Sequence, residues 1–514
     1  MERPVLPSTK TPWFRYPEDL DPVLRDIRDN LDVLDSDVDD IQSGDLPIAL
    51  AGIEGALGEY GPLANMRAGR VNVMDDAWGA VGDGVTDDLP SLQAAVNSGA
   101  PIIDLPPGKT FYGDGTLIID GTQMINGPGA KLLRMTVRMT GARAQLRGLE
   151  IDGDNHTAGG VDMRGDAQAA IDCHIHHTES NGVLFNAGLA SRSRVQNCDI
   201  EDCGSISSNP SYQGNGVYGE SPGALVAGNR IKRVRGYGGV YLVDPDVATI
   251  LGNQIEDTVW RGIHFYSSDS SGKRILVANN QIKDAGGYNG GTDGVGCNGI
   301  YANGVVSQAG DLLIIGNLID HVGENGIEAR HGTIVGNLVR DTGAYPSLVT
   351  PSTEGIWTSG NSVVRANVVV RPKTYGLRRY TTGTMDAAEW SDNVIYDPGT
   401  YGIHAQVHGG SGVMKDFVIR NNSVFDTTGS PTATAGIALV ASGGASITAA
   451  SVFLIGNSVL GIPQSAITSC RHWGNTFDTP QAANADTSGA TLEQLETEVN
   501  EVKAILRSLG KLAA

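Results

Sequence analysis

The chain has 514 residues, of which 69 are glycine, 18% are charged and 6% are aromatic. Average proteins have ~7% glycine and ~25% charged residues. A hydrophobic content of 40% excludes a disordered chain, and no apolar run reaches the ~20 residues of a membrane span, so no membrane insertion is expected. The net charge of -21 argues against a nucleic-acid partner, because an acidic surface repels phosphate.

The sequence of the N-terminal region predicts an attachment segment followed by a coiled coil. Residues 1–19 contain no apolar core of a secretory signal, so we expect a protein that assembles in the cytoplasm. Residues 20–45 carry apolar side chains three and four positions apart, which is typical of a coiled-coil seam. This first seam consists of Leu24, Ile27, Leu31, Leu34, Val38 and Ile41. Residues 46–68 are predicted to be a linker.

A second seam lies at residues 490–514, after a polar linker at 476–489. It consists of Leu492, Leu495, Val499, Val502, Leu506 and Leu509. A single amphipathic helix packed on the rest of the chain is the alternative for each segment. Two separate seams favour an oligomer held at both ends, and we predict a homotrimer, although the seam residues alone do not separate two strands from three.

Between the seams, a phrase of the form apolar-x-(Gly/Asn)-Asn-x-(Ile/Val) recurs about every 28 residues. A second phrase, Gly-(Ile/Val) and then usually a large residue, follows each first one. Short β-branched strands repeated in this way predict an all-β, parallel β-solenoid. The recurring asparagines are expected to take left-handed corners and to bond the coils above and below. They are Asn229, Asn253, Asn280, Asn317, Asn337, Asn367, Asn393, Asn422 and Asn457, and Cys173 and Cys198 fit the same register.

The cysteine pattern gives no sign of a disulfide scaffold or a metal site. The five cysteines form no CxxC pair. The CHIHH run at Cys173–His177 has no second pair of ligands nearby in the sequence. We therefore predict neither a metal nor another cofactor.

Residues 75–99, DDAWGAVGDGVTDDLPSLQAAVNSG, and the following PIIDLPPGKTF resemble the first coil of the pectate-lyase-like superfamily of right-handed β-helices. The matching residues are Gly79, Gly82, Asp83, Gly84, Thr86, Asp87, Asp88, Leu105, Pro106, Pro107 and Gly108. The resemblance implies a right-handed parallel β-helix over residues 69–475. Thr86 or Asp87 would then cap a short helix, in which Leu89, Leu92 and Val96 would cover the open end of the solenoid.

The order of segments is similar to that of bacteriophage tailspikes. This likeness implies a virion protein of the phage tail that binds bacterial surface polysaccharide (capsule, exopolysaccharide or O-antigen) and usually degrades it. It also implies that other phage tail proteins bind the N-terminus. The superfamily contains lyases, hydrolases, epimerases and proteins without activity, so the resemblance is specific for the fold and much less so for the chemistry.

Side chains of a β-solenoid alternate inward and outward, and equivalent residues of successive coils form columns. The residue after each Gly-(Ile/Val) pair is expected to point outward, the next inward and the third outward. The first outward column is Leu184, Tyr218, Tyr241, His264, Tyr301, Glu328, Trp357, Arg378 and His404. The second outward column is Asn186, Glu220, Val243, Tyr266, Asn303, Arg330, Ser359, Tyr380 and Gln406. The inward column is Phe185, Gly219, Leu242, Phe265, Ala302, Ala329, Thr358, Arg379 and Ala405.

The outward columns are rich in aromatic residues for a chain with so few of them, which predicts a glycan-binding groove. Its expected substrate-binding residues are Tyr218, Tyr241, Tyr301, Trp357, Arg378, Tyr380 and His404. Insertions at 204–214, 285–297 and 343–353 are expected to form its wall.

Glycoside hydrolysis needs two carboxyl groups about 5–10 Å apart, and adjacent coils lie about 4.8 Å apart. Glu328 and Glu354 are the expected pair, with Glu328 as general acid and Asp293 as the reserve partner. A polysaccharide lyase needs instead a base and a cation beside a uronate, and His264, Tyr266, Tyr301, Arg330 and Arg378 suit that alternative. An endo-acting hydrolase is slightly favoured over a lyase, and an adhesin that only binds the glycan is the third hypothesis.

Overall fold

The computed structural model describes residues 69–477, apart from 157–158, 205–213, 268–273, 287–295, 303–311, 346–352, 386, 429–431, 449–450, 463–470 and 474. The chain divides into two units, residues 1–68 and 69–514, and every described residue belongs to the second. Both predicted heptad segments lie outside the described residues, so the trimer stays a prediction.

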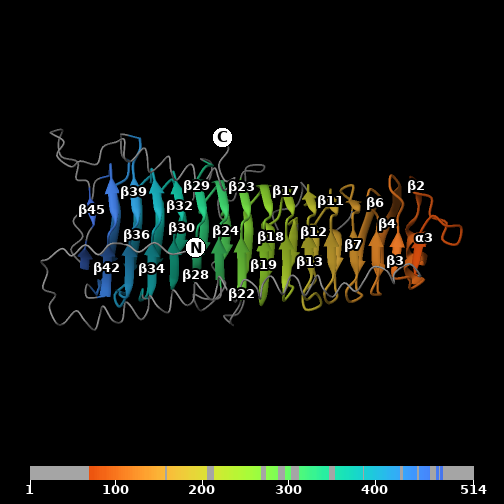
Figure 1. Cartoon of the computed structure of the whole chain (residues 1–514), viewed down its shortest axis with the longest axis horizontal. Helices are drawn as coiled ribbons and strands as arrows, with labels where there is room; N and C mark the ends of the chain where they lie inside the picture. Colours follow the sequence, from red (N-terminus) through yellow and green to blue (C-terminus); the bar gives the residue numbers. More distant parts are fainter. Residues whose placement is uncertain are drawn as a thin grey trace, which may run out of the picture. The chain divides into compact units, whose positions relative to one another are not determined.

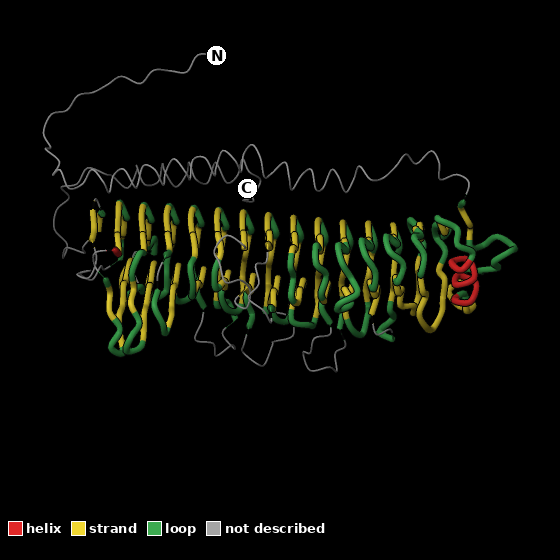
Figure 2. Tube along the Cα trace, turned by 90° about the horizontal axis from the view of Figure 1, so that it is seen from below, coloured by secondary structure: helices red, strands yellow, loops and turns green. Residues whose placement is uncertain are grey.

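The described residues form a parallel β-helix, as predicted (Figure 1). Most coils beyond the first few contribute three short strands, one to each of three faces, and each strand pairs in parallel with its equivalent one coil away (Figure 2). The first face is a 16-stranded sheet. The second and third faces together form a 27-stranded sheet, because the long strands β4 (Thr110–Ile119) and β6 (Lys131–Met139) pair along both.

The first face consists of β1 (Arg70–Asn72), β3 (Ile102–Asp104), β5 (Met124–Asn126), β7 (Gln145–Arg147), β10 (Ala169–Ile171), β13 (Arg194–Gln196), β16 (Ala224–Ala227), β19 (Val247–Leu251), β22 (Arg274–Ala278), β25 (Leu312–Ile315), β28 (Gly332–Val335), β31 (Ser362–Arg365), β34 (Ala388–Ser391), β38 (Phe417–Arg420), β42 (Val452–Ile455) and β44 (Arg471–Trp473).

The second face consists of β8 (Glu150–Asp152), β11 (His174–His176), β14 (Asp199–Glu201), β17 (Arg230–Val234), β20 (Gln254–Thr258), β23 (Gln281–Ala285), β26 (Leu318–Val322), β29 (Leu338–Thr342), β32 (Val368–Val370), β35 (Val394–Tyr396), β39 (Ser423–Phe425), β43 (Ser458–Leu460) and β45 (Thr476–Phe477).

The third face consists of β9 (Gly159–Met163), β12 (Asn181–Phe185), β15 (Val217–Gly219), β18 (Gly238–Val243), β21 (Arg261–Tyr266), β24 (Ile300–Ala302), β27 (Ile327–Ala329), β30 (Ile356–Thr358), β33 (Tyr375–Thr381), β36 (Tyr401–His408) and β40 (Ala435–Ser442). The short strand β2 (Asp83–Asp87) pairs with β4, and β37 (Val413–Met414) pairs with β41 (Ser446–Ile447).

The predicted asparagine column is a buried ladder of hydrogen bonds between the first and second faces. Asn253 Oδ1 accepts bonds from the backbone N–H and the side-chain Nδ2 of Asn229, at 3.0 and 2.9 Å. Asn253 Nδ2 also donates to the backbone oxygen of Val226, at 2.9 Å. The same pattern repeats down the ladder to Asn457. Cys198 takes the equivalent position one coil before Asn229, to which its N–H donates at 2.8 Å. The ladder's structural role is confirmed.

The backbone at these corners differs from the prediction in one respect. The left-handed residue is the one before the ladder asparagine, as in Gly228 (φ 66°), Asn279 (φ 54°) and Ala366 (φ 53°), and none of the ladder asparagines has a positive φ. The preceding residue makes the turn, and glycine does so without steric cost. The asparagine is thereby free to direct its amide at the neighbouring coils.

The core of the β-helix is filled by stacked apolar columns. On the second face, each of the residues Ile231, Ile255, Ile282, Ile319, Val339, Val369, Ile395, Val424 and Val459 is at most 1% exposed. Each lies directly above its equivalent in the next strand. The predicted inward orientation of Ile319 is therefore confirmed.

The only helix among the described residues, α3 (Leu89–Asn97), lies at one end of the stacked coils (Figure 2). It buries Leu92, Ala95 and Val96. Its N-cap position is Asp88, whose carboxylate accepts bonds from the N–H groups of Val81 and Gly82 instead of capping the helix. No helix in the described part of the chain is long and apolar enough to cross a membrane.

The predicted capping residues of α3 behave differently from one another. Asp87 Oδ1 accepts the N–H of Leu89, at 3.1 Å. The hydroxyl of Thr86 instead donates to Asp83, at 2.9 Å, so Thr86 does not cap the helix. The aspartate satisfies a helix N–H because it is one residue closer to the first turn.

Candidate functional site

The third face carries the predicted outward column in the predicted register. Successive strand pairs align Leu184, Tyr218, Tyr241, His264, Tyr301, Glu328, Trp357, Arg378 and His404 in this order. The residues between the two outward columns are buried, including Arg379, whose guanidinium lies 5.3 Å from the ring centre of Phe417. The alternation expected from the Gly-(Ile/Val) phrase is confirmed.

A third column, which we name the leading column, contains the residue before each Gly-(Ile/Val) phrase, and most of its members are buried. Its members are Asn181, Asn215, Gly238, Arg261, Asn298, Asn325, Glu354, Tyr375 and Tyr401. The asparagines of this column form a second ladder. For example, Asn325 accepts the N–H of Glu354 at 2.9 Å, and Asn298 accepts the N–H of Asn325 at 3.0 Å.

The N-terminal part of the first outward column is a packed series of rings. The Tyr241 and His264 rings stack with centres 4.2 Å apart and an angle of 7°, and Tyr218 and Tyr301 lie on either side of this pair. Tyr241 and His264 are 3% and 5% exposed. Burial, assisted by the charge of Arg261, lowers the pKa of His264 to about 2. His264 is therefore neutral and a very weak base.

Arg261 is a buried cation at the centre of this face. Its guanidinium lies 4.1 Å from the ring centre of Tyr301, and its Nη1 lies 3.5 Å from His264 Nδ1. Burial lowers its pKa, although the charges of Glu328 and Glu324 oppose this. An arginine remains protonated at neutral pH, so Arg261 places a positive charge beside two carboxyl groups.

Glu328 is held by the second asparagine ladder. Asn325 and Asn298 donate their Nδ2 groups to Glu328 Oε2, at 2.9 and 3.2 Å. Their side-chain oxygens face the other way, toward backbone N–H groups, so the ladder fixes which end of each amide meets Glu328. Amide donors of this kind favour the ionised form of a carboxyl group. Glu328 also pairs in register with Tyr301 and Trp357, as predicted.

Glu354, the expected partner of Glu328, is fully buried and forms an ion pair with Arg378. Its other oxygen, Oε2, has no hydrogen-bond partner among the described residues. Burial raises the pKa of Glu354 even though Arg378 opposes the shift, and the charge of Glu328 adds to the increase. Glu354 and Glu328 therefore influence each other electrostatically, which agrees with their positions on adjacent coils.

Glu324 is a third carboxyl group of this cluster and was not predicted from the sequence. It is 7% exposed, and its Oε2 accepts the N–H groups of Gly296 and Cys297 at 2.8 and 3.1 Å. Its pKa is raised to about 7, chiefly by burial. The charge of Glu328 adds to the increase, whereas the two N–H donors and the charge of Arg261 oppose it. We refer to Glu324, Glu328 and Glu354 as the carboxyl cluster.

The C-terminal part of the face is again aromatic. The Tyr375 and Tyr401 rings stack at 5.6 Å, and each lies 4.9 Å from the ring of His404. The guanidinium of Arg378 lies 4.8 Å from the ring centre of Tyr375 and 5.5 Å from that of Tyr380. Burial and the charge of Arg378 lower the pKa of His404 to about 4. This part of the face therefore presents aromatic rings and a cation.

The remaining predicted residues lie further along the strands or outside the described part. Tyr266 is 49% exposed and Arg330 is also exposed, and both belong to the second outward column. Asp293 lies outside the described residues, as do most of the insertions expected to form a wall. The structure thus brings Glu328 and Glu354 together with Tyr301, Trp357 and Arg378.

Arg261, Asn298, Asn325, Tyr375 and Tyr401 were also missed by the sequence analysis. A signal for them does exist, because the residue before Gly-(Ile/Val) is asparagine in four coils and changes to Arg261, Glu354, Tyr375 and Tyr401 in others. Glu324 has no such signal, because it lies in the turn before its strand and outside the columns.

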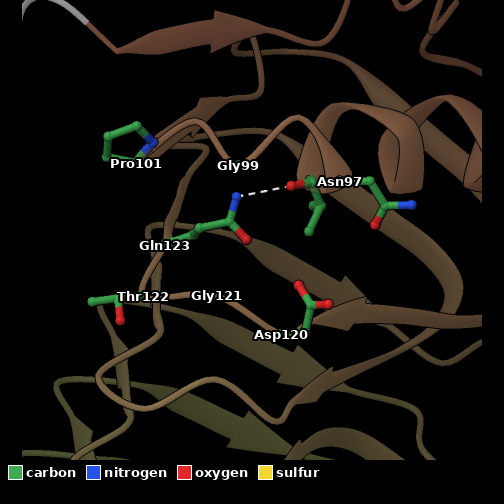
Figure 3. Close-up of a pocket in the computed structure, with 8 residues that line it drawn as sticks. Asn97, Gly99, Pro101, Asp120, Gly121, Thr122 and Gln123 are labelled. Atoms are coloured by element: carbon green, nitrogen blue, oxygen red, sulfur yellow. Dashed lines mark hydrogen bonds between the residues drawn. The ribbon is translucent and has the colours of Figure 1, made fainter.

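A hollow of about 590 Å³ lies at the C-terminal end of α3, several coils away from the carboxyl cluster (Figure 3). Gln123 reaches across it and donates to the backbone oxygens of Val96 and Ala100, both at 2.9 Å. Asp120 is the one ionisable group among its lining residues, which include no aromatic ring. The third face, with its carboxyl groups and rings, is the better candidate for a functional site.

Comparison with known protein families agrees with the fold of part of the chain. Residues 136–304 match the family model for the right handed beta helix region, and no curated protein sequence matches the chain.

Similar solved structures include the A-module of the mannuronan C-5 epimerase AlgE4 of Azotobacter vinelandii, with 16% identity, a TM-score of 0.41 and coverage of 79% of this chain and 99% of that one. The Dettilon tailspike protein has 16% identity, a TM-score of 0.40 and coverage of 74% and 69%. The Pseudomonas phage phi297 tailspike has 11% identity, a TM-score of 0.41 and coverage of 79% and 84%.

The identities of these structures are low, and their TM-scores are all below 0.5. Parallel pairing between successive coils continues on both sides of the matched segment. Residues 136–304 match this family model, and the described coils around them extend the same parallel β-helix.

Proposed function

We propose that the third face is the active face of a polysaccharide depolymerase, and that the chain is a bacteriophage tailspike that binds and shortens a bacterial surface polysaccharide. The observation that carries the proposal is the position of Glu328, a half-buried carboxyl group in register with Tyr301 and Trp357 and beside two further carboxyl groups. Aromatic rings offer apolar faces to sugar rings, and carboxyl groups supply the acid and base of glycoside cleavage.

The cluster supports a division of roles for hydrolysis. One carboxyl group must donate a proton to the leaving oxygen, and another must be ionised. Glu324 suits the donor role because its pKa of about 7 leaves about half of the Glu324 side chains protonated at pH 7. Glu328 suits the ionised role because two amides donate to it. This assignment replaces the general-acid role expected for Glu328 from its aromatic neighbours alone.

Glu354 would act through Arg378 in this scheme. The two form an ion pair, and Arg378 in turn lies over Tyr375. The pair would hold the cation at a fixed place on the face, where it could attract an anionic group of the polymer. Arg261 places a second positive charge there, and together they favour an acidic glycan as the substrate.

A polysaccharide lyase is the second candidate, and one observation favours it. Arg261 lies over the ring of Tyr301, and a tyrosine hydroxyl beside a cation is a suitable candidate for the base that removes an α-proton. Arg378 would then neutralise the uronate carboxylate. His264, the other expected base, is too weak at a pKa of about 2. Tyr266 and Arg330, of the second outward column, would contact the substrate beside these residues in the lyase.

The products of polymer cleavage distinguish the proposals. Incubation with the surface polysaccharide of a susceptible host is expected to give shorter chains with new reducing ends. New reducing ends without absorbance from an unsaturated uronate would support a hydrolase, and both together would support a lyase. Binding without shortening would overturn the enzyme proposal and leave an adhesin.

The proposal for assembly rests on the heptad seams at 20–45 and 490–514. Three chains would associate through them, and residues 1–19 would attach the spike to other tail proteins. The spike would be assembled in the host cytoplasm and would act at the bacterial surface.

A further inference from the structure

Two strands of the second face bring three histidines next to two carboxylates. β11 pairs with β8 so that His174 lies beside Glu150 and His176 beside Asp152. His177 follows directly, in a left-handed conformation with φ of 52°. The CHIHH run, which lacks partners along the sequence, therefore gains its partners from the preceding coil.

Three potential ligand atoms converge at this place. His176 Nδ1 lies 2.7 Å from His177 Nδ1, and Asp152 Oδ1 lies 3.3 Å from His177 Nδ1 and 3.6 Å from His176 Nδ1. A tetrahedral zinc site with bonds of about 2.1 Å has ligand atoms about 3.4 Å apart. Two of the three separations agree with that value, and the third is shorter.

Asp152 Oδ1 accepts the backbone N–H of Asp154 at 3.0 Å, but the protons on the two imidazoles do not give His176 Nδ1 a donor of its own. His176 Nε2 lies 3.2 Å from Glu150 Oε1, so the proton of a neutral ring belongs on Nε2 and leaves a lone pair on Nδ1. A single N–H on His177 Nδ1 is then shared between two acceptors, His176 Nδ1 and Asp152 Oδ1. A cation at their centre resolves the mutual repulsion of the lone pairs.

Glu150 and Lys131 contact the proposed ligand residues in the way that residues around a metal site contact its ligands. Metal-binding histidines commonly donate their second ring N–H to a carboxylate, as His176 does to Glu150. Lys131 Nζ lies 2.8 Å from Glu150 Oε1 and 2.8 Å from Asp152 Oδ2. Asp152 thus uses one oxygen for Lys131 and directs the other at the two imidazoles.

His174 is not part of this set. Its ring stacks on that of His176, with centres 4.2 Å apart and an angle of 28°, so the lone pairs of the two rings run side by side and do not converge. Its Nε2 lies instead 3.1 Å from Glu201 Oε1. The ligands are therefore drawn from Asp152, His176 and His177 alone.

We propose that Asp152, His176 and His177 bind one divalent transition-metal ion, with Zn²⁺ as the preferred ion. Imidazole and carboxylate are common zinc ligands, and three protein ligands leave a fourth position for water. The side chains of Asp152 and His176 are 14% and 8% exposed, whereas that of His177 is 45% exposed and leaves the site open to solvent. The ion would tie two neighbouring coils together, away from the third face.

Metal content of the untagged full-length protein tests the proposal. After treatment with a chelator, the protein is equilibrated with ZnCl₂, dialysed and analysed for zinc, and affinity is measured by titration calorimetry. We expect one Zn²⁺ per chain and an increase in Tm on addition of zinc, because an ion that binds only the folded state stabilises it. Substitution by Co²⁺ is expected to give the visible absorption of a tetrahedral site.

His177→Asn is the informative variant, because asparagine also tolerates a left-handed backbone. His321→Asn is its matched control. His321 has the same side-chain exposure of 45% and a φ of 56°, and its Nδ1 lies 2.6 Å from Asp284 Oδ1. Its other neighbour is the hydroxyl of Tyr345, where His177 has a second histidine. His177→Asn is expected to lower zinc affinity at least tenfold and to abolish the zinc-dependent rise in Tm. His321→Asn is expected to change neither.

Glu150→Gln provides a second variant that keeps all three ligands. Removal of an outer-shell carboxylate is expected to lower affinity about tenfold. The proposal is overturned if wild-type protein retains less than about a tenth of an equivalent of zinc, or if His177→Asn binds it as tightly as His321→Asn. Should a variant fail to fold, the wild-type stoichiometry and the Co²⁺ spectrum decide.

Discussion

Asn325 donates its side-chain amide to Glu328 Oε2 at 2.9 Å, while its own side-chain oxygen accepts the N–H of Glu354 at 2.9 Å. One residue of the second asparagine ladder therefore connects two members of the carboxyl cluster. The ladder is part of the scaffold, because the same bonds join coils elsewhere on this face. The site therefore uses side-chain amides that belong to the scaffold of the β-helix to bind the Glu328 carboxylate.

Glu328→Gln tests the proposed chemistry most directly. The glutamine keeps the shape of the side chain but cannot serve as an ionised base or nucleophile. We expect turnover of the polysaccharide to fall by about two to four orders of magnitude, with binding of the glycan retained. Rates of reducing-end formation and binding isotherms on a non-cleaved polymer provide the two measurements.

Glu256→Gln is a suitable control for that variant. Glu256 lies on β20 of the second face and is half-buried, so its substitution is expected to leave turnover unchanged. Near wild-type activity in Glu328→Gln would show that Glu328 is a surface carboxylate without a catalytic role. Attention would then turn to Tyr301 and Arg261.

The sequence predicted the solenoid and the register of its columns because both follow from local periodicity. A repeated Gly-(Ile/Val) phrase fixes the outward residues, and Glu328 was identified in this way. Burial is not local, however. The pKa shifts of Glu324 and His264 and the position of Arg261 depend on how residues of other coils cover them, and these could not be read from one strand.

The carboxylates beside the CHIHH run were also not predicted from the sequence, because they lie on another coil. Asp152 and His176 are adjacent in space because their strands pair one coil apart. The lengths of the turns that set this pairing vary from coil to coil, so the sequence did not indicate which carboxylate would face the histidines.

Ile319→Asp is expected to prevent folding. Ile319 is fully buried between Ile282 and Val339 of the adjacent coils, and an unpaired charge at that position has no compensating partner. Soluble yield and thermal unfolding measure the effect. Leu318→Asp, at the partly exposed neighbouring position, is expected to remain soluble, and a stable Ile319→Asp protein would contradict the described packing.

The trimer is tested with the double variant Leu31→Asp, Val502→Asp. Each aspartate would be buried on a predicted seam at a cost of several kcal/mol, so the mass in solution should fall from that of three chains to that of one. Light scattering at micromolar concentration measures the mass. A wild-type protein that is already monomeric, or a double variant of unchanged mass, would contradict the prediction.

Glu324 is expected to make stability depend on pH between about 4.5 and 7. Its pKa is raised from 4.5 to about 7, chiefly by burial, so the folded protein retains a proton that the unfolded chain has already released in this interval. The stabilising effect is therefore complete below pH 4.5 and is lost as pH rises to 7, with a total of about 3 kcal/mol. Above pH 7 no further change is expected from this residue.

Glu324→Gln isolates this contribution, because glutamine has no titrating proton. The Tm of wild-type protein should decrease relative to that of the variant as pH rises from 5 to 7, and the difference should then stay constant. If Glu324 is also the proton donor, wild-type kcat should fall above pH 7, where the donor loses its proton. Parallel Tm profiles for the two proteins would show that Glu324 titrates at an ordinary pKa, and the donor would then have to be sought in Glu354.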